Sequence, residues 1–174
     1  MFSRRQFLVA SGGLGVAALA VGVLPTFAGR CSFIGDLIGD ANAAEVFEVT
    51  HSDSEWRALL SDEQYEILRE EGTERAYSSA LNDEHRDGTF ACAGCDRALF
   101  SSATKFDSRT GWPSFWAPLD NAVGIRQDRS FGMVREEVHC RRCGGHLGHV
   151  FDDGPKPTGQ RYCMNGLAMK FTPA

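Results

Sequence analysis

Two C-x-x-C pairs constrain this chain more than any other feature of its sequence. The pairs are Cys92–Cys95 and Cys140–Cys143, and residues 96–139 separate them. A tight C-x-x-C turn presents two thiolates to one tetrahedral ion, so two such turns complete a four-sulfur site. The separation exceeds the usual spacer of a zinc ribbon. We therefore expect one structural zinc ion per chain, joining strands that are distant in the sequence.

Two other states of these cysteines remain open. In an oxidising compartment the pairs would form disulfides, although a bridge closed within C-x-x-C is strained. A redox-active C-x-x-C pair is expected at a helix N-terminus in a βαβ unit. The flanking residues here favour strands, so zinc is the preferred interpretation.

The remaining composition is that of one ordinary globular domain. Hydrophobic residues make up 43% of the 174 residues, and the net charge is -5. The chain has no long basic run, so the sequence does not indicate nucleic-acid binding. Six cysteines are present, and Cys31 and Cys163 stand outside the C-x-x-C pairs. We expect a monomer.

The first 43 residues are predicted to be an export signal. Arg4 and Arg5 precede an uncharged stretch, residues 7–29, that is rich in Gly, Ala, Val and Leu. This order resembles a twin-arginine signal, which implies the twin-arginine export machinery as a partner and a periplasmic or extracytoplasmic location. Cleavage after the small-x-small site at Ala43 would leave residues 44–174 as the mature domain. An uncleaved segment would anchor the protein to the membrane.

Two short helices are expected at the start of the mature domain. Ser52 and Ser61 each open a capping-box pattern, and Gly72 is a helix stop. Tyr65 and Leu68 are three residues apart and share one helix face.

Strands are expected further along the chain, over residues 89–92, 98–101, 131–140 and 162–171. Gly and Pro mark residues 111–118 and 154–159 as ordered loops. The predicted fold is mostly β, with two small antiparallel sheets stapled by the four-cysteine zinc site and short N-terminal helices.

Three segments outside the cysteine pairs are dense in functional side chains. They are residues 111–116 (GWPSFW), 145–151 (GHLGHVF) and 161–165 (RYCMN). Together they resemble the peptide-methionine (R)-S-oxide reductases, the B-type methionine sulfoxide reductases, in the family's order and over residues 45–172. The resemblance implies an oxidoreductase that repairs methionine R-sulfoxide in oxidised proteins.

The resemblance also implies roles for individual residues. Cys163 is the expected nucleophile, which passes through a sulfenic acid. A reactive thiol needs nearby cations or donors, and Arg161 and Asn165 lie two residues to either side of it, on the same strand face. The residues expected to supply a proton or bound water are His146 and His149, and those expected to contact substrate are Trp112 and Phe151.

The sequence departs from the family pattern in one mechanistic respect. Many members carry a resolving cysteine in the loop before GWPSF, but residues 106–110 contain none. The sulfenic acid would therefore be reduced by an external thiol, such as a thioredoxin-like partner. Arg109 stands where the family usually has glycine, and Gly166 stands where serine is common. Neither substitution removes an expected catalytic group, but the sequence does not define the detailed shape of the substrate pocket.

Two hypotheses from other classes remain at this point. One is a zinc-ribbon interaction module without catalysis, which would not need Cys163, Asn165 and both histidines. The other is a thiol-disulfide oxidoreductase that uses a C-x-x-C pair, which zinc bound to all four cysteines would exclude.

Overall fold

The computed structural model describes residues 45–174. The predicted signal segment, its cleavage site at Ala43 and Cys31 lie outside these residues. Within the described part of the chain, no helix is both long and apolar enough to cross a bilayer.

Two capped helices open the domain, as predicted. α1 spans Asp53–Leu59 and α2 spans Asp62–Glu70, and both capping boxes form at Ser52 and Ser61. The left-handed residue that ends α2 is Glu71, at φ 57°, rather than the glycine that follows it.

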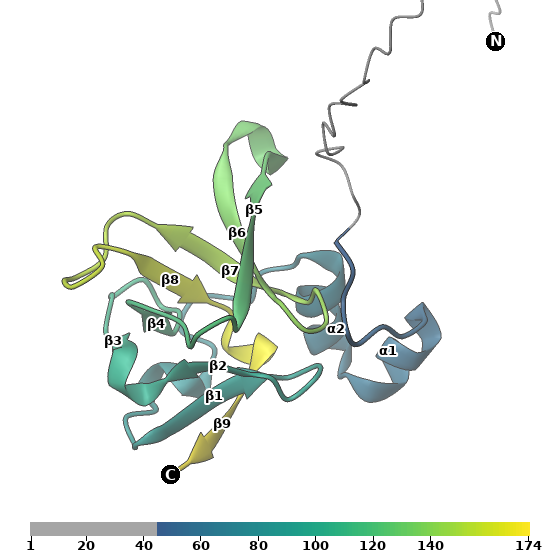
Figure 1. Ribbon diagram of the computed structural model, residues 1–174, viewed down its shortest axis with the longest axis horizontal. Coiled ribbons are helices and arrows are strands. Elements are labelled where there is room, and N and C mark those ends of the chain that lie inside the picture. The colour runs from purple at the N-terminus through teal and green to yellow at the C-terminus, as the bar shows by residue number, and fades with distance from the viewer. Residues whose placement is uncertain (1–44) are drawn as a thin grey trace, which may run out of the picture. The chain divides into compact units, whose positions relative to one another are not determined.

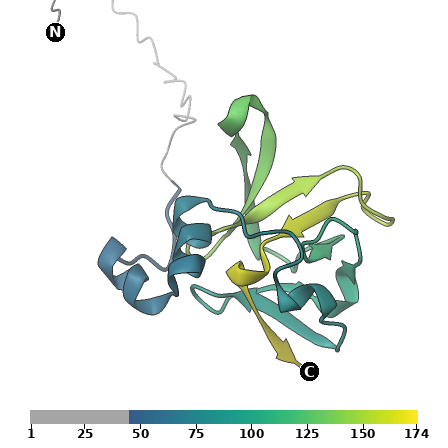
Figure 2. The same ribbon diagram turned by 180° about the vertical axis from the view of Figure 1, so that it is seen from behind.

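The buried face of α2 carries Tyr65, Ile67 and Leu68, so the predicted pair of apolar positions faces the core. Figure 1 and Figure 2 show both helices on one side of the sheets.

All strand pairs are antiparallel, and they form two sheets. A three-stranded sheet has the order β2–β1–β9, and a six-stranded sheet has the order β3–β4–β8–β7–β6–β5. The predicted fold class is confirmed. The strands are β1 (Gly88–Cys92), β2 (Ala98–Ser101), β3 (Lys105–Phe106), β4 (Ser114–Phe115), β5 (Val123–Asp128), β6 (Arg135–Cys140), β7 (His146–Phe151), β8 (Arg161–Met164) and β9 (Met169–Pro173). Short 3-10 turns are η1 (Ala80–Asp83), η2 (Ser102–Thr104), η3 (Ser130–Gly132) and η4 (Gly166–Ala168).

An aromatic cluster joins the two sheets in the core. Phe100 of β2 stacks on Phe115 of β4 with ring centroids 4.4 Å apart, and Phe90 of β1 meets Phe115 edge-on at 4.9 Å. All three rings are fully buried. Burial of each ring contributes about 1.5–3 kcal/mol by removal of apolar surface from water.

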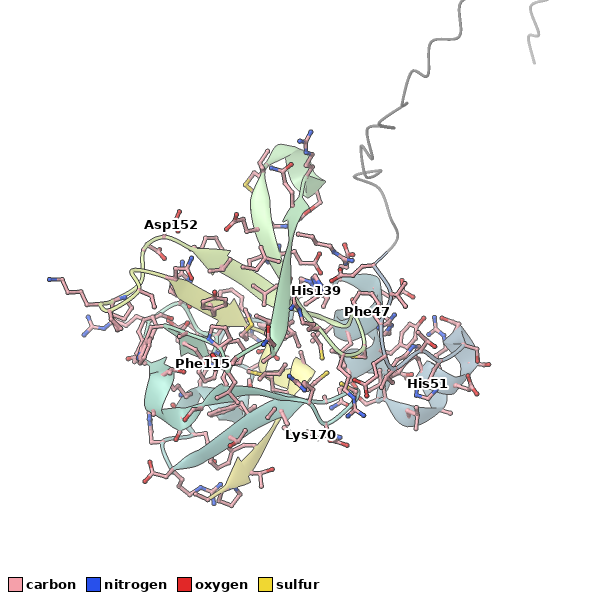
Figure 3. The ribbon with its side chains drawn as sticks, in the orientation of Figure 1. Phe47, His51, Phe115, His139, Asp152 and Lys170 are labelled. Atoms are coloured by element: carbon pink, nitrogen blue, oxygen red, sulfur yellow. The ribbon has the colours of Figure 1, made fainter. Side chains whose placement is uncertain are left out.

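The first described residues lie along the six-stranded sheet. Phe47 packs edge-on against the buried ring of His139, with centroids 5.8 Å apart (Figure 3). Val49 N–H donates to the Arg142 carbonyl at 2.9 Å. The segment before α1 is therefore part of the folded domain.

Two predicted strands are wrong in extent. The strand expected over residues 131–140 begins only at Arg135, because Ser130–Gly132 forms a 3-10 turn in which Gly132 has φ 71°. The strand expected over residues 162–171 is two strands in different sheets, β8 and β9. Between them η4 takes the chain from one sheet to the other.

Other strands were missed. The glycine-punctuated segment expected to be loop over residues 111–118 contains β4, and the segments that form β3, β5 and β7 were not predicted as strands. β7 contains Gly148, and its residues do not alternate between apolar and polar. Pairing with β6 and β8 on both sides, not the side-chain pattern, makes it a strand.

Candidate active site and metal centre

Four cysteines from both sheets converge on one point. Cys92 ends β1 and Cys140 ends β6, while Cys95 and Cys143 lie in the turns that follow those strands. Their four sulfur atoms lie within 4.8 Å of one another. The Sγ atoms of Cys92 and Cys143 are 3.8 Å apart, and those of Cys95 and Cys140 are 3.5 Å apart. The cluster therefore brings together strands of both sheets that are distant in the sequence, as the spacing predicted.

The cluster has the geometry of a metal site. A tetrahedral ion with metal–sulfur distances of about 2.3 Å would hold its sulfur ligands about 3.8 Å apart, close to the separations found. The neighbouring Cys140 sulfur raises the pKa of Cys92 and that of Cys143. Four adjacent thiolates therefore persist only around a cation. No disulfide joins the cysteines of residues 45–174.

A separate cavity of about 140 Å³ contains five of the seven predicted catalytic and substrate-contacting residues. The predicted residues that line it are Trp112, His149, Phe151, Cys163 and Asn165, and the others are Thr73, Arg135 and Gly148.

Cys163 lies in the middle of the six-stranded sheet and opens onto this cavity. It is a β8 residue paired with Ser114 of β4 on one side and His149 of β7 on the other. Its side chain is only partly buried, unlike Cys92, Cys140 and Cys143.

Hydroxyl groups surround the Cys163 sulfur. Thr110 Oγ1 lies 3.8 Å from Sγ, and it also lies 2.8 Å from Ser108 Oγ, which is 2.7 Å from Ser114 Oγ. Burial raises the pKa of the Cys163 thiol, while Thr110, Arg161 and Ser114 act in the opposite direction. Burial prevails, so the resting sulfur keeps its proton at neutral pH.

Each of the two predicted histidines contacts a carboxylate. His149 Nε2 lies 2.9 Å from Asp128 Oδ2. His146 Nδ1 lies 2.8 Å from Glu137 Oε1, and both side chains of that pair are buried. Burial opposes ionisation of Glu137, but bonds from His146 and Arg126 outweigh it and lower its pKa to about 2.

The two histidines occupy different positions relative to the cavity. Their ring centroids are 5.4 Å apart, but only His149 lines the cavity with Cys163. His146 instead lines an adjoining cavity of about 80 Å³, which also includes His149, Thr73 and Arg135.

Trp112 and Asn165 are both fixed by Glu74. Trp112 Nε1 donates to the Glu74 carbonyl at 3.1 Å, and Glu74 N–H donates to Asn165 Oδ1 at 3.0 Å. The Asn165 amide also donates to the Leu147 carbonyl at 3.2 Å. The buried Glu74 carboxylate accepts the N–H groups of η4. Asn165 thus lines the cavity with its amide engaged by backbone.

Arg161 does not line the cavity, although its guanidinium acts on the Cys163 thiol and works to lower the pKa of that group. Its guanidinium makes two bonds to Asp153, at 2.8 and 2.9 Å, and lies 4.4 Å from the Phe151 ring centroid. Arg161 pairs across strands with Phe151, two residues from the pair of Cys163 and His149. It therefore shares the Cys163 face, as predicted.

The residues around the site that were missed by sequence reasoning include Thr73, Glu74, Thr110, Asp128 and Arg135. Thr73 and Glu74 follow α2 and sit far from every motif in the sequence. Asp128 and Arg135 are opposite each other at the end of the β5–β6 hairpin. An acidic and a basic residue flanking a turn is a signal that could have indicated a paired site, although such pairs are common on surfaces.

The chain is similar to proteins of one known family. The SelR domain matches residues 60–173 of the chain. The chain belongs to the SelR family. Its relatives include proteins named peptide methionine sulfoxide reductase MsrB from three distant sources. The identity is 52% with that of Leptospira interrogans, over 72% of this chain and 96% of the relative. It is 56% with that of Thiobacillus denitrificans, over 70% and 93%. It is 49% with that of Methanosarcina mazei, over 72% and 90%.

Membership of the SelR family confirms the resemblance to the B-type methionine sulfoxide reductases. The matched residues include both cysteine pairs and the three motif segments. The match spans all four clustered cysteines and every residue that lines the cavity around Cys163.

Proposed function

We propose that this chain reduces methionine (R)-S-oxide residues in oxidised proteins to methionine, with Cys163 as the reacting thiol. The observation that carries the proposal is one cavity in which the Cys163 side chain meets an indole and an imidazole, those of Trp112 and His149. A thiol next to a proton carrier and an apolar wall suits oxygen transfer from a thioether oxide.

The first half of the reaction balances within the cavity. The Cys163 sulfur attacks the sulfoxide sulfur, and the thiol proton moves to the sulfoxide oxygen through His149. The oxygen then leaves the methionine sulfur for the Cys163 sulfur. Methionine gains two electrons, and Cys163 becomes a sulfenic acid that carries the oxygen and its proton.

The second half requires a thiol from outside the domain. Among residues 45–174, the other four cysteines all belong to the metal-site cluster. An external thiol condenses with the sulfenic acid to form a mixed disulfide and water. A second thiol then releases Cys163 as a thiol and leaves as a disulfide. A thioredoxin-like dithiol provides both sulfurs.

Substrate selection is assigned to the aromatic walls. The Trp112 indole is anchored through Nε1, which leaves its faces free to pack on the methyl group beside the substrate sulfur. Phe151 lines the same cavity, and the Arg161 guanidinium lies 4.4 Å from its ring centroid. Asn165 lines the same cavity with its amide held by backbone groups, and the His146 ring lies 5.4 Å from that of His149.

We assign zinc to the four-cysteine cluster. Cys92, Cys95, Cys140 and Cys143 would all be ligands, and zinc in a closed four-sulfur site supplies folding free energy rather than catalysis. The sulfur separations and the position at the ends of β1 and β6 support this assignment.

Export by the twin-arginine route remains part of the proposal. The paired Arg4 and Arg5 and the uncharged stretch that follows support it. That route carries folded proteins, so the domain would acquire zinc in the cytoplasm and act outside it. Replacing both arginines by lysine should retain the protein in the cytoplasm; unchanged export would reject this route.

The function is tested with the two separated epimers of methionine sulfoxide in a peptide and a small dithiol as reductant. Turnover should be confined to the R epimer, so the S epimer is the internal control. Equal turnover of both epimers, or none of either, would overturn the proposal. Thiol consumption measured alongside should be two per methionine formed.

A further inference from the structure

Asp128 is the carboxylate that contacts His149, and no motif drew attention to it. It ends β5 and pairs across the hairpin with Arg135, which begins β6. Its Oδ2 lies 2.9 Å from His149 Nε2 and accepts from Arg135 Nη2 at 2.6 Å. Its Oδ1 accepts the Ser130 N–H at 2.8 Å. Three donors from three places therefore hold this carboxylate in one orientation.

The contact decides which nitrogen of His149 can act. An ionised carboxylate only accepts hydrogen bonds, so the His149 proton resides on Nε2. Among residues 45–174, no group makes a hydrogen bond to His149 Nδ1, and the ring lines the cavity that holds Cys163. Because Nε2 is engaged by Asp128, Nδ1 is the ring atom left to exchange a proton with groups in the cavity.

We propose that Asp128 is a positioning residue for proton transfer: it holds Nε2–H of His149 so that Nδ1 takes the Cys163 proton and delivers it to the sulfoxide oxygen. The inference rests on the proposed reduction of methionine sulfoxide. The proton lost by sulfur equals the proton gained by oxygen, and Asp128 itself stays ionised throughout. Nucleophile, base and orienting carboxylate come from β8, β7 and β5.

The charged groups around His149 determine the direction in which each substitution should shift its pKa. Burial lowers its pKa, Asp128 opposes that effect, and Arg135 and His146 add to it. Glu71 and Glu137 line the adjoining cavity with it, and Cys163 lines the main one. The ring is therefore neutral at neutral pH and able to accept a proton. Removing the Asp128 charge lowers the His149 pKa further, whereas removing the Arg135 charge raises it.

Two variants should therefore shift the pH profile of kcat/KM in opposite directions. His149 must be neutral to take the thiol proton, so kcat/KM rises with pH through its pKa. Asp128→Asn should move this limb to lower pH and reduce the plateau about tenfold or more, because the base is weaker and less well held. Arg135→Gln should move the limb to higher pH. Asp96→Asn removes an exposed carboxylate paired with Lys170 and is the matched control, with no displacement.

Nitrogen NMR of the histidine rings tests the same point without turnover. In the zinc-loaded wild-type domain, neutral His149 should carry its proton on Nε2. The opposite tautomer would overturn the proposal even if Asp128→Asn fails to fold. A limb that stays in place in Asp128→Asn while the variant remains folded would overturn it too. If the wild-type domain does not reduce the R epimer, the proposed function is rejected. The tautomer of His149 is measured without substrate, so that result is distinguishable from a failure of the Asp128 proposal.

Discussion

The domain holds cysteine sulfur in two contrasting environments. At the junction of the sheets, each of four sulfurs has other sulfurs as its nearest partners, at separations such as 3.5 and 3.8 Å. In the middle of the six-stranded sheet, Cys163 lies outside that cluster, and its partners are Thr110 and the other lining groups of an open cavity. In the proposed function the same side chain is a ligand in one place and a reactant in the other.

The difference lies in what each environment offers a thiol. A cluster of thiols ionises around a cation and is then protected from attack, because every sulfur is engaged. A lone thiol flanked by hydroxyls and a histidine can give up its proton when an acceptor arrives. The two environments also differ in position, since Cys140 ends one strand of the same sheet in which Cys163 is central.

The largest expected effect comes from removing the Cys163 thiol while the four-cysteine cluster stays intact. Cys163→Ser should reduce R-epimer turnover by about a thousandfold or more, because serine oxygen cannot accept the sulfoxide oxygen. Metal content should stay at one ion per chain, and the melting temperature should change little. Residual turnover within tenfold of wild type would show that another sulfur reacts.

The next largest effect is expected when a cysteine of the four-cysteine cluster, rather than Cys163, is replaced by serine. Cys95→Ser removes one of four ligands and should lower the melting temperature by about 10 °C or more, because metal binding contributes folding free energy. Atomic absorption should show loss of metal. The two serine variants are controls for each other, so a variant at Cys95 that folds normally and keeps its metal would contradict the proposed metal site.

A third variant makes the two environments more alike. Thr110→Cys places a thiol where an oxygen now lies 3.8 Å from the Cys163 sulfur. After one turnover the introduced thiol should condense with the sulfenic acid, releasing water and forming an internal disulfide. Thiol titration should then show two thiols lost per chain without added reductant. Thr158→Cys, in an exposed loop, is the control that should form none.

The smallest expected effect concerns Glu137, the buried carboxylate that contacts His146 and Arg126. Ionised Glu137 has a folded-state pKa of about 2, below its ordinary 4.5. Its contribution to stability is therefore present above about pH 4.5 and is lost as pH falls toward 2. Glu137→Gln should cost about 1–2 kcal/mol at neutral pH and flatten this part of the acid unfolding curve. Glu136→Gln, at the exposed neighbouring position, should leave the curve unchanged.

Prediction from the sequence succeeded where local chemistry is sufficient. The capping boxes at Ser52 and Ser61 depend on residues three apart, so they could be recognised directly. The cysteine pairs also carry their own geometry. Strand ends were less predictable, because the alternating pattern of residues 162–171 is the same whether the chain stays in one sheet or crosses between two.

Some residues of the candidate site could likewise be identified from the sequence, and others could not. Cys163, Trp112 and His149 stand in motifs dense enough to identify, and all three line one cavity. Glu74 and Asp128 could not be identified, because a carboxylate gains its role only from what it meets across the fold. Glu74 lies far along the chain from Asn165, yet it bonds to that residue and to the η4 turn.

The amino-acid sequence by itself determined the family, the two helices and the four-cysteine cluster, since motifs and caps are encoded in short stretches of neighbouring residues. Tertiary structure alone decided which carboxylate faces each histidine, that Asn165 is held by backbone, and how the strands divide between two sheets. The physical reason is that hydrogen bonds and charge interactions act over a few ångströms in space, whereas the residues that make them here are distant in the chain.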